Sequence, residues 1–181
     1  MAHTRMRTGA PPRIHPPSTV SPGAQIGSDV VIGTCCFVAG GAVIGAGSRV
    51  QSHTSIWDGV TLEEDVFVGP GAMFTNIRHP RAAIVRSPDW ARTIVERGAT
   101  LGAGAILVAP VRVGHHAMVG AGAVVVEDVA AHAIVVGNPA RVVGWACVCG
   151  ETVSRERICP PVARCASCGE TIESTDSLPQ G

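Results

Sequence analysis

The chain has 181 residues with 14 acidic and 14 basic side chains, so its formal net charge is zero. A neutral chain gives no electrostatic reason to expect nucleic acid or an anionic membrane as a partner. Every basic residue is arginine, which excludes a lysine base, a Schiff base and a P-loop. No apolar run reaches membrane-spanning length and the start has no apolar signal core, so we expect a cytoplasmic protein with no membrane partner.

Residues 1–18 are rich in proline and arginine. This composition predicts a tail that is disordered or loosely docked.

From residue 19 onward, apolar residues recur at every sixth position. A helix repeats every 3.6 residues and a strand every 2, whereas a period of six with small neighbours indicates short strands joined by turns, three to a triangular coil. Twenty-two glycines and the absence of tyrosine suit a prism too narrow for most rings. We therefore predict an all-β fold, a parallel β-helix over residues 19–143. The series is Val20, Ile26, Ile32, Val38, Ile44, Val50, Ile56, Leu62, Val68, Phe74, then Val95, Leu101, Leu107, Val113, Val119, Val125.

The repeat is interrupted at about residues 75–94. The step from Phe74 to Val95 is 21 residues, which is not a multiple of six. A long loop ejected from an otherwise strict repeat is usually functional or disordered.

Residues 144–181 contain a cysteine pattern that predicts a small zinc-ribbon-like unit. Cys147-x-Cys149-Gly is followed by Cys165-x-x-Cys168-Gly, and paired cysteines at this spacing are typical of zinc sites. The first pair is one residue shorter than the usual knuckle, and Cys159 is a possible spare ligand. Four thiolates would leave no open position, so the zinc would be structural.

Two stretches resemble nucleotide-sugar N-acetyltransferases of the left-handed β-helix superfamily. They are VQSHTSIWDGVTLEEDVFVGPGAMFTNIRHPRA and the region from ERGATLG to VVGNPARVVGWACVCG, with FTN, PRA and VVGNPARVVGW as the specific motifs. The UDP-2-acetamido-3-amino-2,3-dideoxy-glucuronate N-acetyltransferases are the most similar subgroup. The resemblance implies a left-handed coil, a homotrimer with sites between subunits, acetyl-CoA as the acetyl donor and a nucleotide-sugar substrate in surface-polysaccharide biosynthesis.

Asn76 matches the active-site asparagine of that family. Its amide can accept a hydrogen bond from the incoming amine or donate one to a developing oxyanion, although a residue capping a turn is the alternative. His53 stands where the subgroup often has asparagine (QSH in place of QNN). It is a candidate base, a substrate contact or a solvated turn residue. The departing CoA thiolate could accept the proton instead.

The resemblance places five further residues near the substrate. We expect Trp57 to pack on a base or sugar, Asp58 to hold a hydroxyl or the amine, and Arg81 to meet a diphosphate or carboxylate. For Trp57 the competing interpretation is a turn with an exposed ring. Arg78 is a second candidate for the contact of Arg81, with a solvated loop arginine as its alternative. The five are Trp57, Asp58, Phe74, His79 and Arg81.

Small turns are the candidate acetyl-CoA site. Turns that contain Ala103 and Ala121 would let a pantetheine arm lie along the backbone, although coil geometry alone also requires glycine there. In the family, the turn that begins at Gly137 and Asn138 lies by the adenine end of CoA, and Arg141 could pair with a phosphate.

Three rival functions remain open. The first is an acetyltransferase of the same fold with another small acceptor. The second is a γ-type carbonic anhydrase-like trimer, which needs three histidines around zinc; the local pair here, His115 and His116, is expected to diverge. The third is a non-catalytic assembly subunit.

Overall fold

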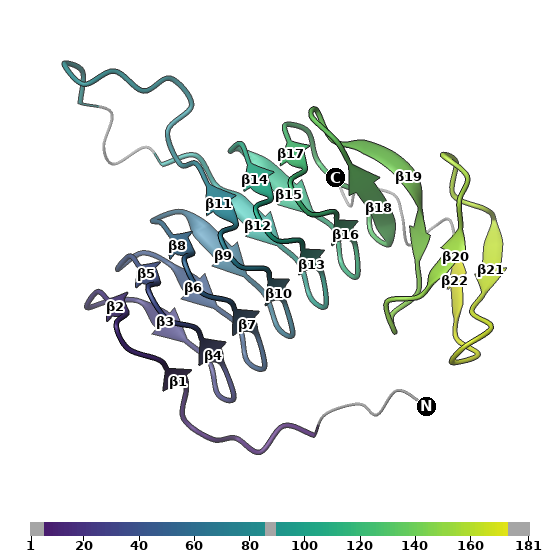
Figure 1. Ribbon diagram of the computed structural model, residues 1–181, viewed down its shortest axis with the longest axis horizontal. Coiled ribbons are helices and arrows are strands. Elements are labelled where there is room, and N and C mark those ends of the chain that lie inside the picture. The colour runs from purple at the N-terminus through teal and green to yellow at the C-terminus, as the bar shows by residue number, and fades with distance from the viewer. Residues whose placement is uncertain (1–5, 86–89, 174–181) are drawn as a thin grey trace.

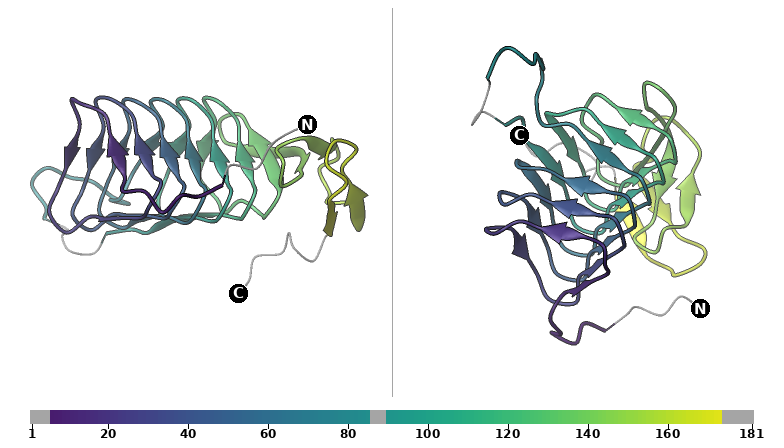
Figure 2. Two further views of the ribbon diagram at one scale, coloured as in Figure 1. Left: turned by 90° about the horizontal axis from the view of Figure 1, so that it is seen from below. Right: turned by 60° about the vertical axis from the view of Figure 1, so that its left-hand side comes forward.

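The computed structural model describes residues 6–85 and 90–173. In these ranges the chain forms short strands and turns with no helix. The strands stack into a parallel solenoid, seen as a ladder of coils in Figure 1 and from two other directions in Figure 2. The ends of the expected tails (1–5 and 174–181) and residues 86–89 of the expected loop lie outside the described residues.

Three sheets form the sides of the prism. Sheet A contains β1 (Arg13–Ile14), β4 (Val31–Ile32), β7 (Arg49–Val50), β10 (Phe67–Val68), β13 (Thr100–Leu101), β16 (Met118–Val119), β18 (Ala133–Val136), β19 (Arg141–Ala146) and β20 (Thr152–Ser154). Sheet B contains β2 (Thr19–Val20), β5 (Phe37–Val38), β8 (Ser55–Ile56), β11 (Met73–Phe74), β14 (Ile106–Leu107) and β17 (Val124–Val125). Sheet C contains β3 (Gln25–Ile26), β6 (Val43–Ile44), β9 (Val60–Leu62), β12 (Thr93–Val95) and β15 (Val111–Val113).

The predicted six-residue series forms the core. In a two-residue strand the side chains point to opposite faces, and here the second residue points inward, as in β5 and β8. Every member of the series from Ile32 to Val125 is buried. Val20 and Ile26, in the first coil, are half-buried because they lack a complete coil beyond them. Each fully buried aliphatic side chain contributes about 1.5–3 kcal/mol.

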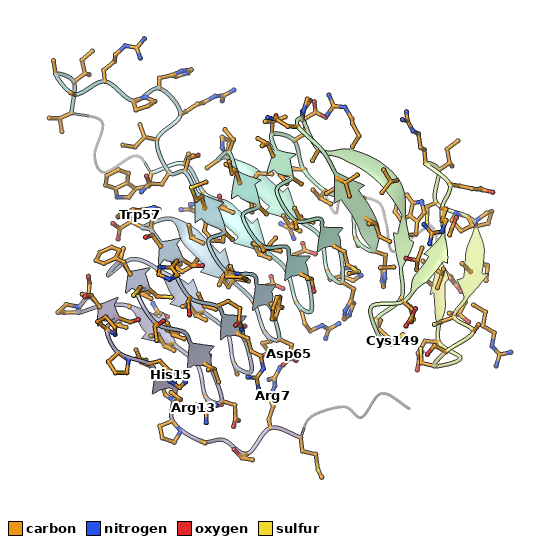
Figure 3. The ribbon with its side chains drawn as sticks, viewed as in Figure 1. Arg7, Arg13, His15, Trp57, Asp65 and Cys149 are labelled. Atoms are coloured by element: carbon orange, nitrogen blue, oxygen red, sulfur yellow. The ribbon has the colours of Figure 1, made fainter. Side chains whose placement is uncertain are left out.

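The β-helix begins earlier than residue 19. Strand β1 (Arg13–Ile14) pairs in parallel with β4, and residues 6–10 run along the outside of the coils. Arg7 donates to Asp65 at 2.5 Å and to Glu64 at 3.2 Å, and Figure 3 shows Arg7 beside Asp65. The backbone N–H groups of Thr8 and Gly9 donate to the Asp29 carboxylate. The described part of the N-terminal segment is therefore docked.

The ejected loop lies between β11 and β12 and projects from the ladder (Figure 1). Thr93 pairs with Val60 on one side and with Val111 on the other. The segment from Thr93 to Val111 is one 18-residue coil, whereas the segment from Val60 to Thr93 is 15 residues longer. The loop is therefore a 15-residue insertion that leaves the ladder and returns to it in register.

The C-terminal strands close the last coil. β18 continues sheet A in parallel with β16, and β19 pairs with it in the antiparallel direction. β19 runs across residue 144, where the sequence suggested a new unit, and leads through β20 to the hairpin of β21 (Val162–Arg164) and β22 (Thr171–Glu173). Buried Trp145 donates through Nε1 to the Glu156 carbonyl at 3.0 Å.

Candidate functional site

The residues predicted to bind the substrate and acetyl-CoA lie at or beside two of the three corners of the triangular coil. We call the turn region between sheets B and C the loop corner, because the ejected loop leaves there. The region between sheets A and B is the small-residue corner, and that between sheets C and A is the histidine corner.

Asn76 lies at the loop corner, at the first turn of the ejected loop. Its side-chain Nδ2 donates to the backbone carbonyl oxygen of Asp58 at 3.3 Å. Its backbone carbonyl oxygen accepts from the Ala91 N–H at 2.9 Å. A carbonyl oxygen can only accept, so the NH₂ of Asn76 must be the group that faces Asp58. Among the described residues, Asn76 Oδ1 has no hydrogen-bond partner. The free group of this amide is therefore an acceptor.

Trp57 and Asp58 lie beside Asn76 on the preceding coil. Trp57 is 40% exposed, and its ring centroid lies 5.2 Å from that of Phe37; Figure 3 shows it close to the base of the loop. Asp58 Oδ1 accepts from the Gly41 N–H at 2.7 Å. An exposed aromatic face and a half-buried amide thus lie at one corner.

The other expected substrate residues lie in different surroundings. Phe74 is 4% exposed and packs in the prism core, so it supports the corner from the inside. His79 and Arg81 lie in the exposed loop, and Arg81 donates to the Pro80 carbonyl.

His53 lies at the small-residue corner, the other edge of sheet B. It is exposed and adopts a φ of 62°. Strand β8 separates it from Trp57, so a single chain does not bring His53 and Asn76 together. Their different positions in the repeat, His53 before Ile56 and Asn76 after Phe74, are the sequence signal for this separation.

The candidate acetyl-CoA residues extend along this same corner. The turns of Ala103 and Ala121 are stacked, with the Gly122 N–H donating to the Ala103 carbonyl at 2.8 Å. The coils approach so closely that a Cβ at Gly102 would lie 2.4 Å from the Ala121 nitrogen. Packing alone therefore requires glycine at residue 102.

The turn after β18 continues this corner. The Gly137 carbonyl accepts from the Val124 N–H at 2.9 Å, which docks the turn on β17. Asn138 is exposed. The exposed Arg141 donates to the Ala140 carbonyl at 2.9 Å. His53 and all five candidate acetyl-CoA residues thus share one edge of the prism.

The histidine corner was not anticipated. His115, His116 and His132 lie with ring centroids 5.1–5.7 Å apart. Burial, with help from His132, His115 and Arg97, lowers the pKa of His116 to about 4. Glu96 accepts from the His115 N–H at 2.8 Å and forms an ion pair with Arg112.

Four cysteines converge as the sequence predicted. The Sγ atoms of Cys147, Cys149, Cys165 and Cys168 all lie within 4.8 Å of one another. The Cys147–Cys168 and Cys149–Cys165 pairs are 3.4 and 3.7 Å apart. Zinc–sulfur bonds of about 2.3 Å in a tetrahedron require sulfurs about 3.8 Å apart, so the set fits zinc. Among the described residues, the three histidines do not form such a group, and neither does Cys159.

The thiols of Cys165 and Cys147 differ in pKa. The backbone N–H groups of Cys168 and Ser167 lower the pKa of Cys165 to about 7. Burial raises the pKa of Cys147 to about 12. A cation is therefore needed to hold all four sulfurs as thiolates near neutral pH.

No family model matches the chain. It is 39% identical over 90 residues to dTDP-3-amino-3,6-dideoxy-alpha-D-galactopyranose 3-N-acetyltransferase of Aneurinibacillus thermoaerophilus, covering 50% of this chain and 45% of that one. It is 36% identical over 125 residues to serine acetyltransferase of Mycobacterium tuberculosis, covering 69% and 44%. The chain thus spans less than half the length of these curated relatives.

Among solved structures, the chain matches the acetyltransferase domain of PglB from Neisseria gonorrhoeae in complex with acetyl coenzyme A. The TM-score is 0.64 at 30% identity, covering 74% of this chain and 58% of that one. These matches confirm the predicted fold: the solenoid is a left-handed parallel β-helix of hexapeptide repeats. The chain is similar over its β-helix to the hexapeptide-repeat acetyltransferases. No described residues form a helix long and apolar enough to cross a bilayer.

Proposed function

We propose that this chain is a cytoplasmic, acetyl-CoA-dependent N-acetyltransferase that acts on the 3-amino group of a nucleotide-linked amino sugar in surface-polysaccharide biosynthesis. The observation that carries the proposal is the Asn76 amide at the base of the loop, with Nδ2 engaged and Oδ1 free to accept. The match to a 3-amino-sugar N-acetyltransferase supports this acceptor class. The UDP-2-acetamido-3-amino-glucuronate subgroup is the specific substrate class that the sequence motifs favour.

The chemistry needs little from the protein. A sugar amine should titrate near pH 8, so part of it is neutral at working pH. Asn76 Oδ1 accepts a hydrogen bond from an N–H of this amine. This bond orients the lone pair of the amine nitrogen toward the thioester carbon. The new C–N bond forms, the C–S bond breaks, and the ammonium proton passes to the departing CoA thiolate or to His53.

A homotrimer would complete this site. Asn76 and Trp57 lie at one corner of the coil, whereas His53 and the candidate acetyl-CoA residues lie at another. In a trimer with intersubunit sites, the loop corner of one subunit would face the small-residue corner of its neighbour. We therefore propose that donor and acceptor bind to different chains.

We also propose that the four cysteines hold one structural zinc ion. Their spacing fits tetrahedral thiolate coordination. The metal would crosslink the β19–β20 turn to the β21–β22 hairpin, and four thiolates leave no position for a substrate.

A second acceptor class is favoured by one observation: the serine acetyltransferase match covers more of this chain than the amino-sugar enzyme does. A panel of amino nucleotide sugars, with L-serine included, should be assayed for CoA release. Turnover of a 3-amino nucleotide sugar well above L-serine is expected. Turnover of L-serine alone, or no CoA release with any acceptor, would contradict the proposal.

A further inference from the structure

One oxygen of the Asp58 carboxylate at the loop corner is already engaged within the chain. Its Oδ1 accepts from the Gly41 N–H, one coil below, at 2.7 Å. A Cβ at Gly41 would lie 2.7 Å from this same oxygen, so residue 41 must be glycine for the carboxylate to approach. The Asp58 side chain is thus an anchor between two coils.

The turn that follows this anchor is fixed from above as well. Gly59 has a φ of 85°, and its carbonyl accepts from the Thr93 N–H at 3.0 Å on the next coil. The Val60 N–H donates to the Trp57 carbonyl at 3.2 Å and closes the turn. The Asp58 peptide therefore has a defined orientation.

The Asp58 carbonyl is the acceptor that holds Asn76 Nδ2. An amide that could rotate freely would offer either its oxygen or its NH₂ to a ligand. Because a carbonyl oxygen faces the NH₂, only the orientation with Oδ1 free is favourable. The orientation of the Asn76 amide thus depends on the Asp58 peptide, and this peptide depends on the bond to Gly41.

We propose that Asp58 is a positioning residue: through its bond to Gly41 it holds the carbonyl that orients the Asn76 amide as an acceptor for the substrate amine. The role of Asn76 as an acceptor for the substrate amine rests on the proposed function. The proposal differs from a direct role, in which the negative charge of Asp58 would bind the substrate itself.

Three variants separate these roles. Asp58→Asn keeps an Oδ1 that can accept from Gly41 N–H but removes the charge. Asp58→Ala removes the acceptor. Gly41→Ala leaves Asp58 intact but displaces its carboxylate. Its control is Gly9→Asn, in the docked N-terminal segment, where a Cβ meets nothing within 4 Å and asparagine tolerates the φ of 71°.

The first measurement needs no turnover. Side-chain amide resonances of Asn76 and hydrogen exchange of the Gly41 N–H are followed by NMR in the full chain. Asp58→Ala should shift the Asn76 NH₂ signals and speed Gly41 exchange by 10-fold or more, about the loss expected for a bond to a charged acceptor. Asp58→Asn should leave both near wild type. Unchanged Asn76 signals in Asp58→Ala and Gly41→Ala would overturn the proposal whatever reaction the protein catalyses.

The second measurement is kinetic, on the best acceptor found. Asp58→Ala and Gly41→Ala should lower kcat by about 10-fold, with unchanged KM for acetyl-CoA and near-normal kcat in Asp58→Asn. In an Asn76→Ala background, Asp58→Ala should lower kcat no further. A direct contact between Asp58 and the substrate would give a different result. Asp58→Asn and Asp58→Ala would then raise the KM for the acceptor equally, and Gly41→Ala would have normal kinetics. This result would overturn the proposal. If no acceptor turns over, the proposed function fails, and the NMR result still decides whether Asp58 positions Asn76.

Discussion

His116 should make the folded state sensitive to acid. Its imidazole is half-buried among His115, His132 and Arg97, which holds its pKa at about 4, against 6.5 for a free histidine. Above pH 6.5 the side chain is neutral in both the folded and unfolded states and contributes nothing. Below this pH the unfolded chain binds a proton first, so the free energy of unfolding falls until the folded pKa is reached.

The size of the effect follows from the pKa difference. A gap of about 2.5 pH units would be worth about 3.4 kcal/mol for a fully buried group. Because much of the ring remains in contact with solvent, we expect about 1–2 kcal/mol. The loss should begin near pH 6.5 and be complete near pH 4.

Urea unfolding of wild type and His116→Asn at several values between pH 7.5 and 4.5 tests this. Asparagine tolerates the positive φ of 55° at this residue and does not titrate. Any effect of low pH on the proposed zinc site is common to both proteins, so the difference between their curves isolates His116. Parallel curves over the whole range would refute the reasoning.

Four further outcomes are expected. Asn76→Ala should lower kcat by about 10²-fold with little change in acetyl-CoA affinity measured by calorimetry; near-normal turnover would move the site elsewhere. Thr93→Val should raise stability in urea by about 1 kcal/mol, because the buried Thr93 Oγ1 lacks a partner among the described residues and lies between Val60 and Val111; destabilisation would show that the hydroxyl is satisfied. Gly102→Ala should cost about 3 kcal/mol, since its Cβ would lie 2.4 Å from the Ala121 backbone, whereas Gly104→Asn, with open space, should cost little. Cys165→Ser should lose about one zinc per chain by elemental analysis, unlike Cys35→Ser at an exposed turn; full zinc retention would exclude the proposed ligand set.

The six-residue period was sufficient to predict the core, because each buried residue of a coil occupies the same place in the repeat. Ile56 and Leu107 needed no information from distant residues to be placed. The ejected loop and the cysteine cluster were equally predictable, since both are local departures from a regular pattern.

Contacts between distant residues were not predictable in this way. Arg7 and Asp65 are 58 residues apart in the sequence. The local composition of the proline-rich start therefore predicted a tail and not a docked segment. His116 and His132 adopt corresponding turn conformations only 16 residues apart, because the last coil is shorter than the 18-residue repeat. The bond from Gly41 to Asp58 depends on a side-chain conformation that the repeat does not specify.

The register of the insertion has a consequence for how acceptor preference could diversify. β12 pairs with β9 and β15 as it would if residues had never been inserted between β11 and β12. The length and composition of the inserted segment can therefore drift without disturbing the hydrogen-bond ladder of the coils. The anchored turn and the small-residue corner belong to the ladder and cannot drift in this way. Under the proposed function, exchange of this segment between relatives should alter which acceptor is used and should leave binding of the acetyl donor unchanged.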